Sequence, residues 1–410
     1  MSSTARFGRA PSSATPVEPV VVARQPIFDR AENVIGFELL TPAHRTADPR
    51  GASASVLVQS FADVGLDRLV GGYPAYVNVT REFLIAVRPL PLAPQSVVLQ
   101  IDASGGPDDV LVAIVRDAVA DGFRIALDGF RHAPGSESLL ALASIVKLDV
   151  ERMDGETLTG TVAALRGQDI ALLASNVETR AQYEDCRALG FAGFQGRFFS
   201  EPARLTGSSA PTYRLRALSM LAARGDLSSF ESLERVIVED PGLSHKLVRL
   251  ANSAFFGGRR PVGSIRQALM MLGSVAVRRW ATLLVLAGVT DRPNHLLELG
   301  LTRARLCELI AIRDQEAEPE RAFTVGLFSV VDALLRLPMP QLLEELPFDD
   351  RAKGALTDHV GPEGRILAGV LAYEAGDFER CSTRGVSLID IARAYRDALD
   401  WTTDAALQLA

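Results

Sequence analysis

The chain has 410 residues, of which 48% are hydrophobic and 23% are charged. These proportions are typical of a folded globular protein and exclude a fibrous or largely disordered one. At roughly 100 to 200 residues per domain, the length predicts about two to four folding units. The formal net charge of −7 argues against nucleic-acid binding by the molecule as a whole, so any such contact would need a local basic patch.

The spacing of the cysteines and the length of the apolar runs indicate where in the cell the protein is expected. Cys186, Cys307 and Cys381 are widely spaced without a C-x-x-C pair, which argues against a disulfide framework and a thiolate zinc site. No apolar run approaches the roughly 18 to 20 residues needed to span a bilayer, and the N-terminus lacks the apolar core of a signal peptide. We therefore expect a cytoplasmic protein with no membrane partner. Residues 1–19, rich in small and polar residues, predict a disordered leader.

Residues 20–205 alternate short β-branched or apolar runs with helical patterns, which is typical of a βα-repeating fold with a mostly parallel sheet. The first two predicted strands are too close for a parallel crossover and predict an antiparallel hairpin. Eight strands with interleaved helices predict an atypical (β/α)8-type barrel. The predicted strands cover residues 20–28, 34–40, 75–80, 97–102, 124–130, 145–150, 169–175 and 190–196.

One helix of this half can be predicted together with its apolar face. Residues 107–120 lie between two predicted strands and carry apolar side chains at helical spacing. Val110, Ile114, Val115 and Val119 would share one face, which we expect to pack against the sheet.

The second half shows helix signals and no strand pattern. Residues 206–212, a cluster of small and turn residues, predict a linker. Beyond it, Asp240 stands before a proline as an N-cap, and Ser264 stands three residues before a glutamine as the start of a capping box. We therefore predict an α/β domain over residues 20–205, followed by an all-α domain over residues 213–410.

Polar side chains stand at or just after the C-terminal ends of the predicted strands, where barrel enzymes place their chemistry. Taken singly, a carboxylate there is more often a helix cap or a surface charge. Lys147 is a stronger signal, because an ammonium group in a buried strand needs an anionic partner or ligand. The residues in question are Glu38, Asn78, Asp128, Lys147, Glu178 and Gln195.

Residues 20–205 resemble the EAL domains, the cyclic di-GMP phosphodiesterase family. The blocks GFELL, AYVNVT, VVLQID, RIALDGF, IVKLDV, ASNVET and GFQGRFFSEP follow the order of that family's signature blocks. The resemblance implies a barrel mouth that holds two divalent cations, Mg²⁺ or Mn²⁺, on oxygen ligands for phosphodiester hydrolysis.

The same resemblance assigns roles to the polar residues. It implies metal binding by Glu38, Asn78 and Asp128. It implies that Lys147 is catalytic and orients the attacked phosphate. Ligand contacts would come from Glu178 and Gln195.

Several positions depart from the family pattern. Pro42 stands where the family has a phosphate-holding arginine, and Arg131 replaces the glycine that closes the D-D-F-G block. Three carboxylates of the metal cluster are replaced, by Gln100, Gly129 and Ser175. Losing one ligand or supporting group typically costs about 10- to 100-fold in metal affinity or activity. We therefore expect a degenerate site, with no working pair of metals.

The stretch DPGLSHKLVRLANSAFFGGRRPVGSIRQALMMLG, residues 240–273, resembles the core block of HDOD domains, helical modules related to the HD phosphohydrolases, and the likeness extends over about residues 213–401. An active HD enzyme needs an adjacent His-Asp pair, and no histidine here precedes an aspartate. The resemblance thus implies a non-enzymatic module.

Arginines cluster within this helical half, near an indole. They could form a contact surface for an acidic partner or a phosphate backbone, or a solvated helix face paired with the acidic stretch 314–320. The candidates are Arg259, Arg260, Arg266, Arg278 and Arg279, together with Trp280.

These inferences predict a bacterial signal-transduction protein without catalytic activity. The barrel would sense or dock, and the HDOD module would bind other signalling proteins, with no cofactor and no nucleic acid required. The alternatives are a cyclic di-GMP phosphodiesterase that uses Mg²⁺ or Mn²⁺, and a receptor that binds cyclic di-GMP without hydrolysis.

Overall fold

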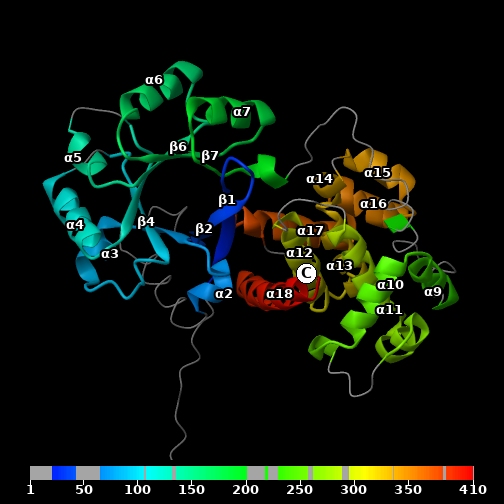
Figure 1. The fold of residues 1–410 in the computed structure, drawn as a ribbon. Helices are drawn as coiled ribbons and strands as arrows, with labels where there is room; N and C mark the ends of the chain where they lie inside the picture. Colours follow the sequence, from blue (N-terminus) through cyan, green and yellow to red (C-terminus); the bar gives the residue numbers. More distant parts are fainter. Residues whose placement is uncertain are drawn as a thin grey trace, which may run out of the picture.

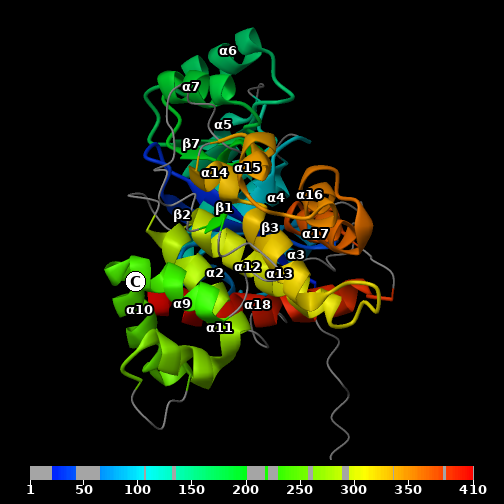
Figure 2. The same ribbon diagram turned by 90° about the vertical axis from the view of Figure 1, so that its right-hand side faces the viewer.

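The computed structural model describes residues 21–42, 65–105, 108–131, 135–200, 218–219, 230–256, 262–288, 295–335, 337–381 and 385–409. A closed eight-stranded barrel comes first in the chain, and a helical part lies beside it (Figures 1 and 2). The predicted fold class, an α/β barrel followed by an all-α domain, is confirmed. The predicted leader, residues 1–19, and linker, residues 206–212, lie outside the described residues.

The barrel strands follow one another in chain order around the sheet. β1 pairs antiparallel with both β2 and β8, which confirms the predicted first hairpin, and the other neighbours pair parallel. The strands are β1 (Ala23–Phe28), β2 (Val34–Leu40), β3 (Ala75–Val79), β4 (Val97–Asp102), β5 (Arg124–Asp128), β6 (Ile145–Asp149), β7 (Ala171–Ser175) and β8 (Gly193–Phe194).

Short helices cover the outside of the barrel, several of them begun by side-chain caps. The Asp108, Asp154 and Thr179 side chains each accept a hydrogen bond from a backbone amide in the first turn. The described elements are α2 (Leu66–Val70), α3 (Arg81–Ala86), α4 (Asp109–Ala120), α5 (Glu137–Leu140), α6 (Gly155–Leu165), α7 (Arg180–Leu189) and the 3₁₀ turn η2 (Arg197–Ser200).

The predicted apolar face of α4 is right for Val115, which is buried, and for Ile114, which packs against the core, but wrong for Val110 and Val119. Val110 and Val119 are 47% and 37% exposed, whereas the buried residues are Leu111, Val112, Val115 and Ala118. This helix carries apolar side chains on more than one face, so periodicity alone does not single out one of them, and packing against the sheet selects the face that is buried.

The helical part begins with the helices predicted from their caps. Asp240 and Ser264 accept hydrogen bonds from the amides of Leu243 and Gln267. The elements are α9 (Phe230–Glu239), α10 (Pro241–Ala251), the 3₁₀ turn η4 (Ala254–Phe256), α11 (Ile265–Ala287), α12 (His295–Ala311), α13 (Pro319–Phe328), α14 (Val331–Leu335), α15 (Met339–Glu345), α16 (Asp350–Thr357), α17 (Gly361–Glu374) and α18 (Leu388–Leu409).

Among the helices that the structure describes, α11 alone is long and apolar enough to cross a bilayer as a single segment. Half of its apolar window is buried inside the fold, and Gly273 interrupts its helical backbone with a φ of 82°. Buried core helices meet the same criterion of length and hydropathy.

Helices α12 and α13 cross at very short range because glycines stand at the contact. A Cβ atom added to Gly326 of α13 would lie 2.6 Å from the Arg303 carbonyl oxygen of α12, and one added to Gly300 of α12 would lie 2.6 Å from the Val330 side chain. Backbone atoms cannot rotate out of the way as a side chain can, so the Gly326 contact fixes the spacing of the two helices.

We predict that Gly326→Ala destabilises the protein by about 1 to 3 kcal/mol, because the added methyl group forces the two helices apart. The matched control is Gly160→Ala in α6, where an added Cβ meets nothing within 4 Å, and where alanine should stabilise the helix by up to about 1 kcal/mol. Urea unfolding followed by circular dichroism measures both. Equal stability of the two variants would contradict the close crossing.

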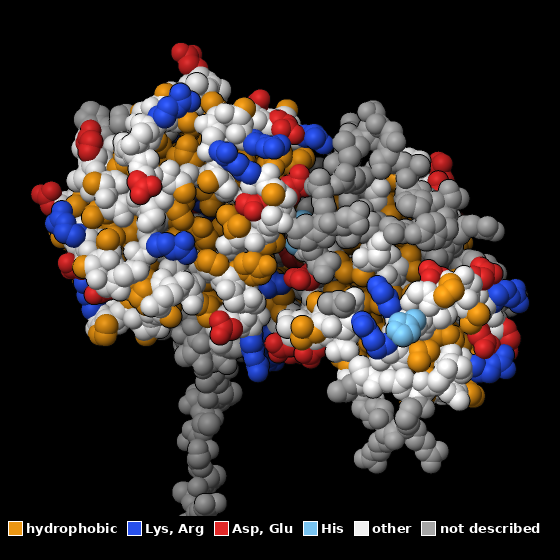
Figure 3. All heavy atoms as spheres, in the orientation of Figure 1, with side chains coloured by type: hydrophobic (Ala, Val, Ile, Leu, Met, Phe, Trp, Pro, Cys, Tyr) orange, Lys and Arg blue, Asp and Glu red, His pale blue; other side chains and the backbone are white. Residues whose placement is uncertain are grey.

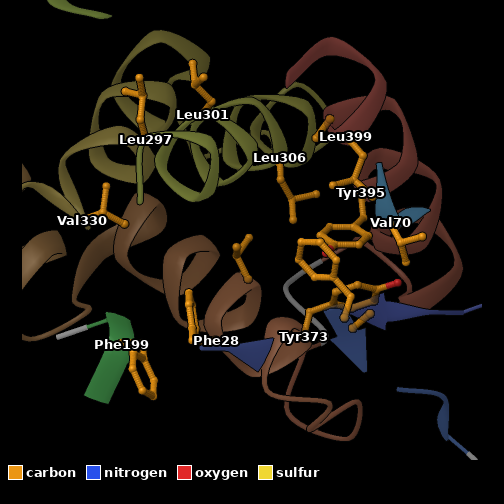
Figure 4. Close-up of a cluster of buried hydrophobic side chains, with 14 of the residues drawn as sticks. Phe28, Val70, Phe199, Leu297, Leu301, Leu306, Val330, Tyr373, Tyr395 and Leu399 are labelled. Carbon is orange, nitrogen blue, oxygen red and sulfur yellow. The ribbon is translucent and has the colours of Figure 1, made fainter. Parts of the chain in front are cut away.

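The barrel and the helical part share one continuous buried core. The Tyr373 hydroxyl of α17 donates a hydrogen bond of 2.9 Å to the Val22 carbonyl, just before β1. The Phe28 ring of β1 stacks on Phe199 at 4.5 Å and meets His295 of α12 edge-on at 4.7 Å. Figure 4 shows Phe28, Phe199 and Tyr373 beside β1, with the helices of the helical part around them. The interface is therefore built like a domain interior.

Candidate functional site at the barrel mouth

The barrel mouth gathers five polar side chains from five different positions of the sheet. Glu38 lies on β2, opposite Tyr76 of β3. Asn78 of β3 is paired in register with Gln100 of β4. Lys147 lies on β6 and Gln195 directly follows β8. Because their side chains point inward, Glu38, Gln100, Lys147 and Gln195 are each 6% exposed or less.

Glu38 is the centre of this cluster and accepts four hydrogen bonds. Its Oε1 atom accepts from Gln100 Nε2 at 2.7 Å and from Asn78 Nδ2 at 3.1 Å. Its Oε2 atom accepts from Lys147 Nζ at 2.8 Å and from Gln195 Nε2 at 2.7 Å. A carboxylate offers about four lone-pair positions, so each position on Glu38 already has a donor.

The charges in the cluster stabilise one another. Burial alone would raise the pKa of Glu38, but the Lys147 ammonium and the Gln195 and Gln100 amides outweigh it and hold that pKa at about 2. Burial would likewise lower the pKa of Lys147, and the carboxylates of Glu38 and Asp128 raise it instead. Both groups are therefore charged at neutral pH.

Asp128, at the end of β5, is the more open carboxylate. Its Oδ2 atom lies 3.6 Å from Lys147 Nζ, and its side chain is 35% exposed. Burial raises its pKa although Lys147 opposes the shift. Asp128 therefore faces the mouth with oxygen atoms that are less fully engaged than those of Glu38.

Glu178 does not join the Glu38 cluster. Its carboxylate pairs with Arg197 at 2.7 Å and lines a cavity of about 850 Å³ between the barrel and helices α12 and α17. Gln25 of β1 lines the same cavity.

Gln25 was missed by the sequence interpretation. Its Oε1 atom accepts a hydrogen bond of 2.7 Å from Gln195 Nε2, and it is paired in register with Glu38. A polar amide within the predicted first strand, beside Arg24, was the signal that could have revealed it. Through Gln25, the hydrogen-bond network of the mouth reaches the strand that contacts the helical part.

The positions that depart from the EAL pattern hold no replacement carboxylate. Gly129 has a φ of 63°, and Ser175 is buried and donates a hydrogen bond to the Leu148 carbonyl at 3.2 Å. Pro42 is partly buried, and Arg131 is exposed. In the part of the chain that the structure describes, no group of three or more His, Cys, Asp or Glu side chains is placed to hold a metal ion.

The predicted contact surface of arginines and Trp280 in the helical half is not formed as expected, because Trp280 is buried. Trp280 is 4% exposed and packs against Phe255 and Phe256, so its expected role at a surface is wrong: this face of α11 is covered by other aromatic side chains. Arg259 and Arg260 lie outside the described residues.

The remaining arginines are paired with acids. Arg266 binds Glu234 at 2.7 Å. Arg278 lies 3.5 Å from Glu320, within the acidic stretch that the second interpretation named. On the face shown in Figure 3, cationic and anionic side chains are interspersed over both parts of the molecule.

Comparisons with known proteins agree with both resemblances. The EAL domain model matches residues 79–202 and the HDOD domain model matches residues 210–347. Over 403 residues the chain is 31% identical to "Cyclic di-GMP phosphodiesterase CdgJ" of Vibrio cholerae, covering 93% of this chain and 92% of that protein. It is 29% identical to "Uncharacterized protein YuxH" of Bacillus subtilis, covering 93% and 98%.

Solved structures of EAL proteins are similar to less than half of this chain. The structure described as "PaMucR Phosphodiesterase, c-di-GMP complex" is 23% identical, with a TM-score of 0.38, and the match covers 44% of this chain and 95% of that one. The match to CdgJ spans nearly the full length of both proteins, so it includes both the EAL and the HDOD regions of this chain. The chain therefore belongs to the family of proteins that join an EAL domain to an HDOD domain in cyclic di-GMP signalling.

Proposed function

We propose that this protein transmits a signal without catalysing a reaction, with a degenerate EAL barrel as the sensing or docking unit and the HDOD domain as the output that binds other signalling proteins. The observation that carries the proposal is the state of Glu38. Each lone-pair position of this carboxylate is used by Asn78, Gln100, Lys147 or Gln195.

The donor set of the mouth does not fit a pair of divalent cations. Mg²⁺ and Mn²⁺ require several oxygen ligands, carboxylates above all. Glu38 and Asp128 supply two negative charges, and the Lys147 ammonium between them cancels one. Gln100 turns its amide nitrogen, not its oxygen, toward Glu38. We therefore propose that the barrel works without a metal cofactor.

Hydrolysis of cyclic di-GMP is the second candidate function, and two observations favour it. The relative that is 31% identical is named a cyclic di-GMP phosphodiesterase. Glu38, Asn78, Asp128 and Lys147 also remain together at the mouth, where the EAL resemblance would place metal ligands and the catalytic lysine. In that case Mg²⁺ or Mn²⁺ would activate the water molecule that attacks the phosphodiester.

A third possibility, between the non-catalytic signalling protein and the phosphodiesterase, is a receptor that binds cyclic di-GMP without hydrolysing it. The Oε1 atoms of Gln100 and Gln195 are buried and accept no hydrogen bond from the described residues, so the mouth holds unused acceptors for a ligand that carries N–H groups. Glu178, beside Arg197, and Gln195 are the ligand contacts that we propose.

We extend the proposal to the organisation of the chain. It divides into a leader over residues 1–19, the barrel over residues 20–205, a linker over residues 206–212 and the helical domain over residues 213–410. We propose a cytoplasmic location, in keeping with partners that are themselves signalling proteins.

The deciding experiment uses the purified full-length chain. It is titrated with cyclic di-GMP in Mg²⁺ and in Mn²⁺ while binding and the linear product are both followed. Neither binding nor product is the expected result, and tight binding without product would favour the receptor. Turnover that Asp128→Asn abolishes, and that the exposed control Asp169→Asn leaves intact, would overturn the non-catalytic proposal.

A gain-of-function variant tests the metal argument directly. Gln100→Glu should raise Mn²⁺ affinity at least tenfold, because it places a second carboxylate against Glu38 that a cation would neutralise. Thermal unfolding with and without Mn²⁺ should show stabilisation by the metal in this variant, but not in the wild type or in the exposed control Gln168→Glu. An equally large Mn²⁺ effect in the wild type would contradict the proposal.

A further inference from the structure

A second pocket, of about 330 Å³, lies within the helical domain, away from the barrel mouth. Helices α11 and α13 and the segment that leads into α16 form its walls. Its apolar lining includes Phe323, Phe328 and Phe348, and its polar lining includes three guanidinium groups, those of Arg278, Arg279 and Arg321. The volume falls within the usual range for small-molecule sites.

The three guanidinium groups are held in place by carboxylates. Arg278 lies 3.5 Å from Glu320, and Arg321 donates a hydrogen bond to Asp349. Arg279 binds Glu308 at 2.7 Å. Arg305 binds the same carboxylate at 2.7 Å, so Arg279 and Arg305 share one anion.

The carboxylates at the rim are more exposed than the arginines they pair with. The side chains of Asp349 and Glu320 are 49% and 32% exposed, whereas those of Arg321 and Arg278 are both 14% exposed. Water can solvate the partly exposed carboxylates when they leave, whereas the largely buried guanidinium groups need an anionic partner in their place. An anion that enters the pocket can therefore replace these carboxylates at modest cost.

One wall of the pocket combines charge with an aromatic ring. The guanidinium carbon of Arg279 lies 4.3 Å from the centroid of the Phe323 ring. Stacking and the ion pair with Glu308 keep this guanidinium in a fixed orientation, so it adds positive charge to the wall. The phenyl rings beside it favour an apolar, planar body on the same ligand.

We propose that this pocket binds a small organic anion, a phosphate or carboxylate carried on a planar apolar body. The acid group pairs with Arg278 and Arg321 in place of Glu320 and Asp349, and the apolar body lies against the phenylalanine rings. The site is independent of the barrel mouth, and it gives the helical domain an input of its own.

The test measures binding of 8-anilinonaphthalene-1-sulfonate, an aromatic anion, to the full-length chain by fluorescence. N-phenyl-1-naphthylamine, which has the same rings without the sulfonate, is the uncharged comparison. Arg321→Gln and Arg278→Gln should each weaken binding of the sulfonate about tenfold, the loss of one charge-assisted hydrogen bond, with little effect on the neutral probe. The exposed Arg235→Gln on α9 is the matched control.

The variant Asp349→Asn should change sulfonate binding in the opposite direction. Asparagine keeps the N-cap of α16, in which Asp349 accepts a hydrogen bond from the Ala352 amide, but it removes one of the two charges that compete for Arg321, the other being Glu318 at 3.5 Å. Binding of the sulfonate should therefore become several-fold tighter. Unchanged sulfonate binding in Arg278→Gln, Arg321→Gln and Asp349→Asn would overturn the proposal, as would equal losses for both probes in folded variants.

Competition identifies the acid group that the pocket prefers. Phenyl phosphate and benzoate share a phenyl group and differ in the acid. The compound that displaces the sulfonate probe at the lower concentration shows whether the pocket prefers a phosphate or a carboxylate. Displacement by either compound, lost in Arg321→Gln, supports the proposal. Displacement by neither would count against it.

Discussion

Glu38→Ala is expected to destabilise the protein by about 3 to 5 kcal/mol, the usual consequence of removing one partner of a buried ion pair. The variant leaves Lys147, 6% exposed, without its closest carboxylate, and it leaves the amides of Asn78, Gln100 and Gln195 without their shared acceptor. Urea unfolding of the full-length chain, followed by far-ultraviolet circular dichroism, measures the loss.

The same site predicts a dependence of stability on pH. The pKa of Glu38 lies at about 2 in the fold, below its ordinary value of 4.5. A lowered carboxyl pKa means that ionised Glu38 contributes its full stabilisation above about pH 4.5, and that the contribution is lost as pH falls toward 2. The stability difference between the wild type and Glu38→Gln should therefore be largest near neutrality and shrink in acid.

A double variant separates charge burial from loss of packing. Glu38→Leu combined with Lys147→Met replaces the ion pair with apolar side chains of similar size, and it should be markedly more stable than Glu38→Ala. The exposed Glu151→Gln serves as the control and should change stability by less than about 0.5 kcal/mol. A Glu38→Ala variant as stable as this control would refute the central role given to Glu38.

Phe28→Ala is expected to cost about 3 to 5 kcal/mol, because it opens a cavity in the core that the barrel and the helical domain share. The ring is 1% exposed and touches Phe199 and His295 from two sides. The damage should spread to both parts of the molecule, since the ring belongs to β1 and one of its neighbours begins α12.

Hydrogen exchange monitored by mass spectrometry is the measurement that locates this damage. Peptides from β1, α12 and α17 should all exchange faster in Phe28→Ala. The control Phe230→Ala removes the same group from the start of α9, where the side chain is 36% exposed, and it should leave these peptides unchanged. Faster exchange confined to the barrel would show that the shared core contributes little.

The barrel could be predicted in detail because its signals are local. Apolar runs bounded by turn residues gave the eight strands in order, and the short connection after Phe28 gave the antiparallel hairpin. The gathering of Glu38, Asn78 and Lys147 followed from the rule that parallel strands bring their C-terminal ends to one edge. The bonding within that cluster could not be predicted, because it depends on distances of a few tenths of an ångström.

The predictions that failed concern which side of an element is covered. Trp280 stands among arginines in the sequence, yet rings from other segments bury it. Half of the α4 face was misassigned for the same reason, since Val110 and Leu111 are similarly apolar and only packing against the rest of the fold distinguishes them. Contacts between distant segments are absent from local sequence patterns, and they also placed Gln25 in the network.

The bond between Tyr373 and Val22 joins residues 351 positions apart, and this separation has a consequence for how the protein is made. During synthesis, the strand that begins at Ala23 emerges long before α17 and α18 exist to cover it. The Val22 carbonyl and the side of β1 that packs on α17 therefore remain uncovered until nearly the whole chain has been made, an interval of at least about 17 seconds at 5 to 20 residues per second. Chaperones that hold apolar segments would act on the nascent barrel during that interval.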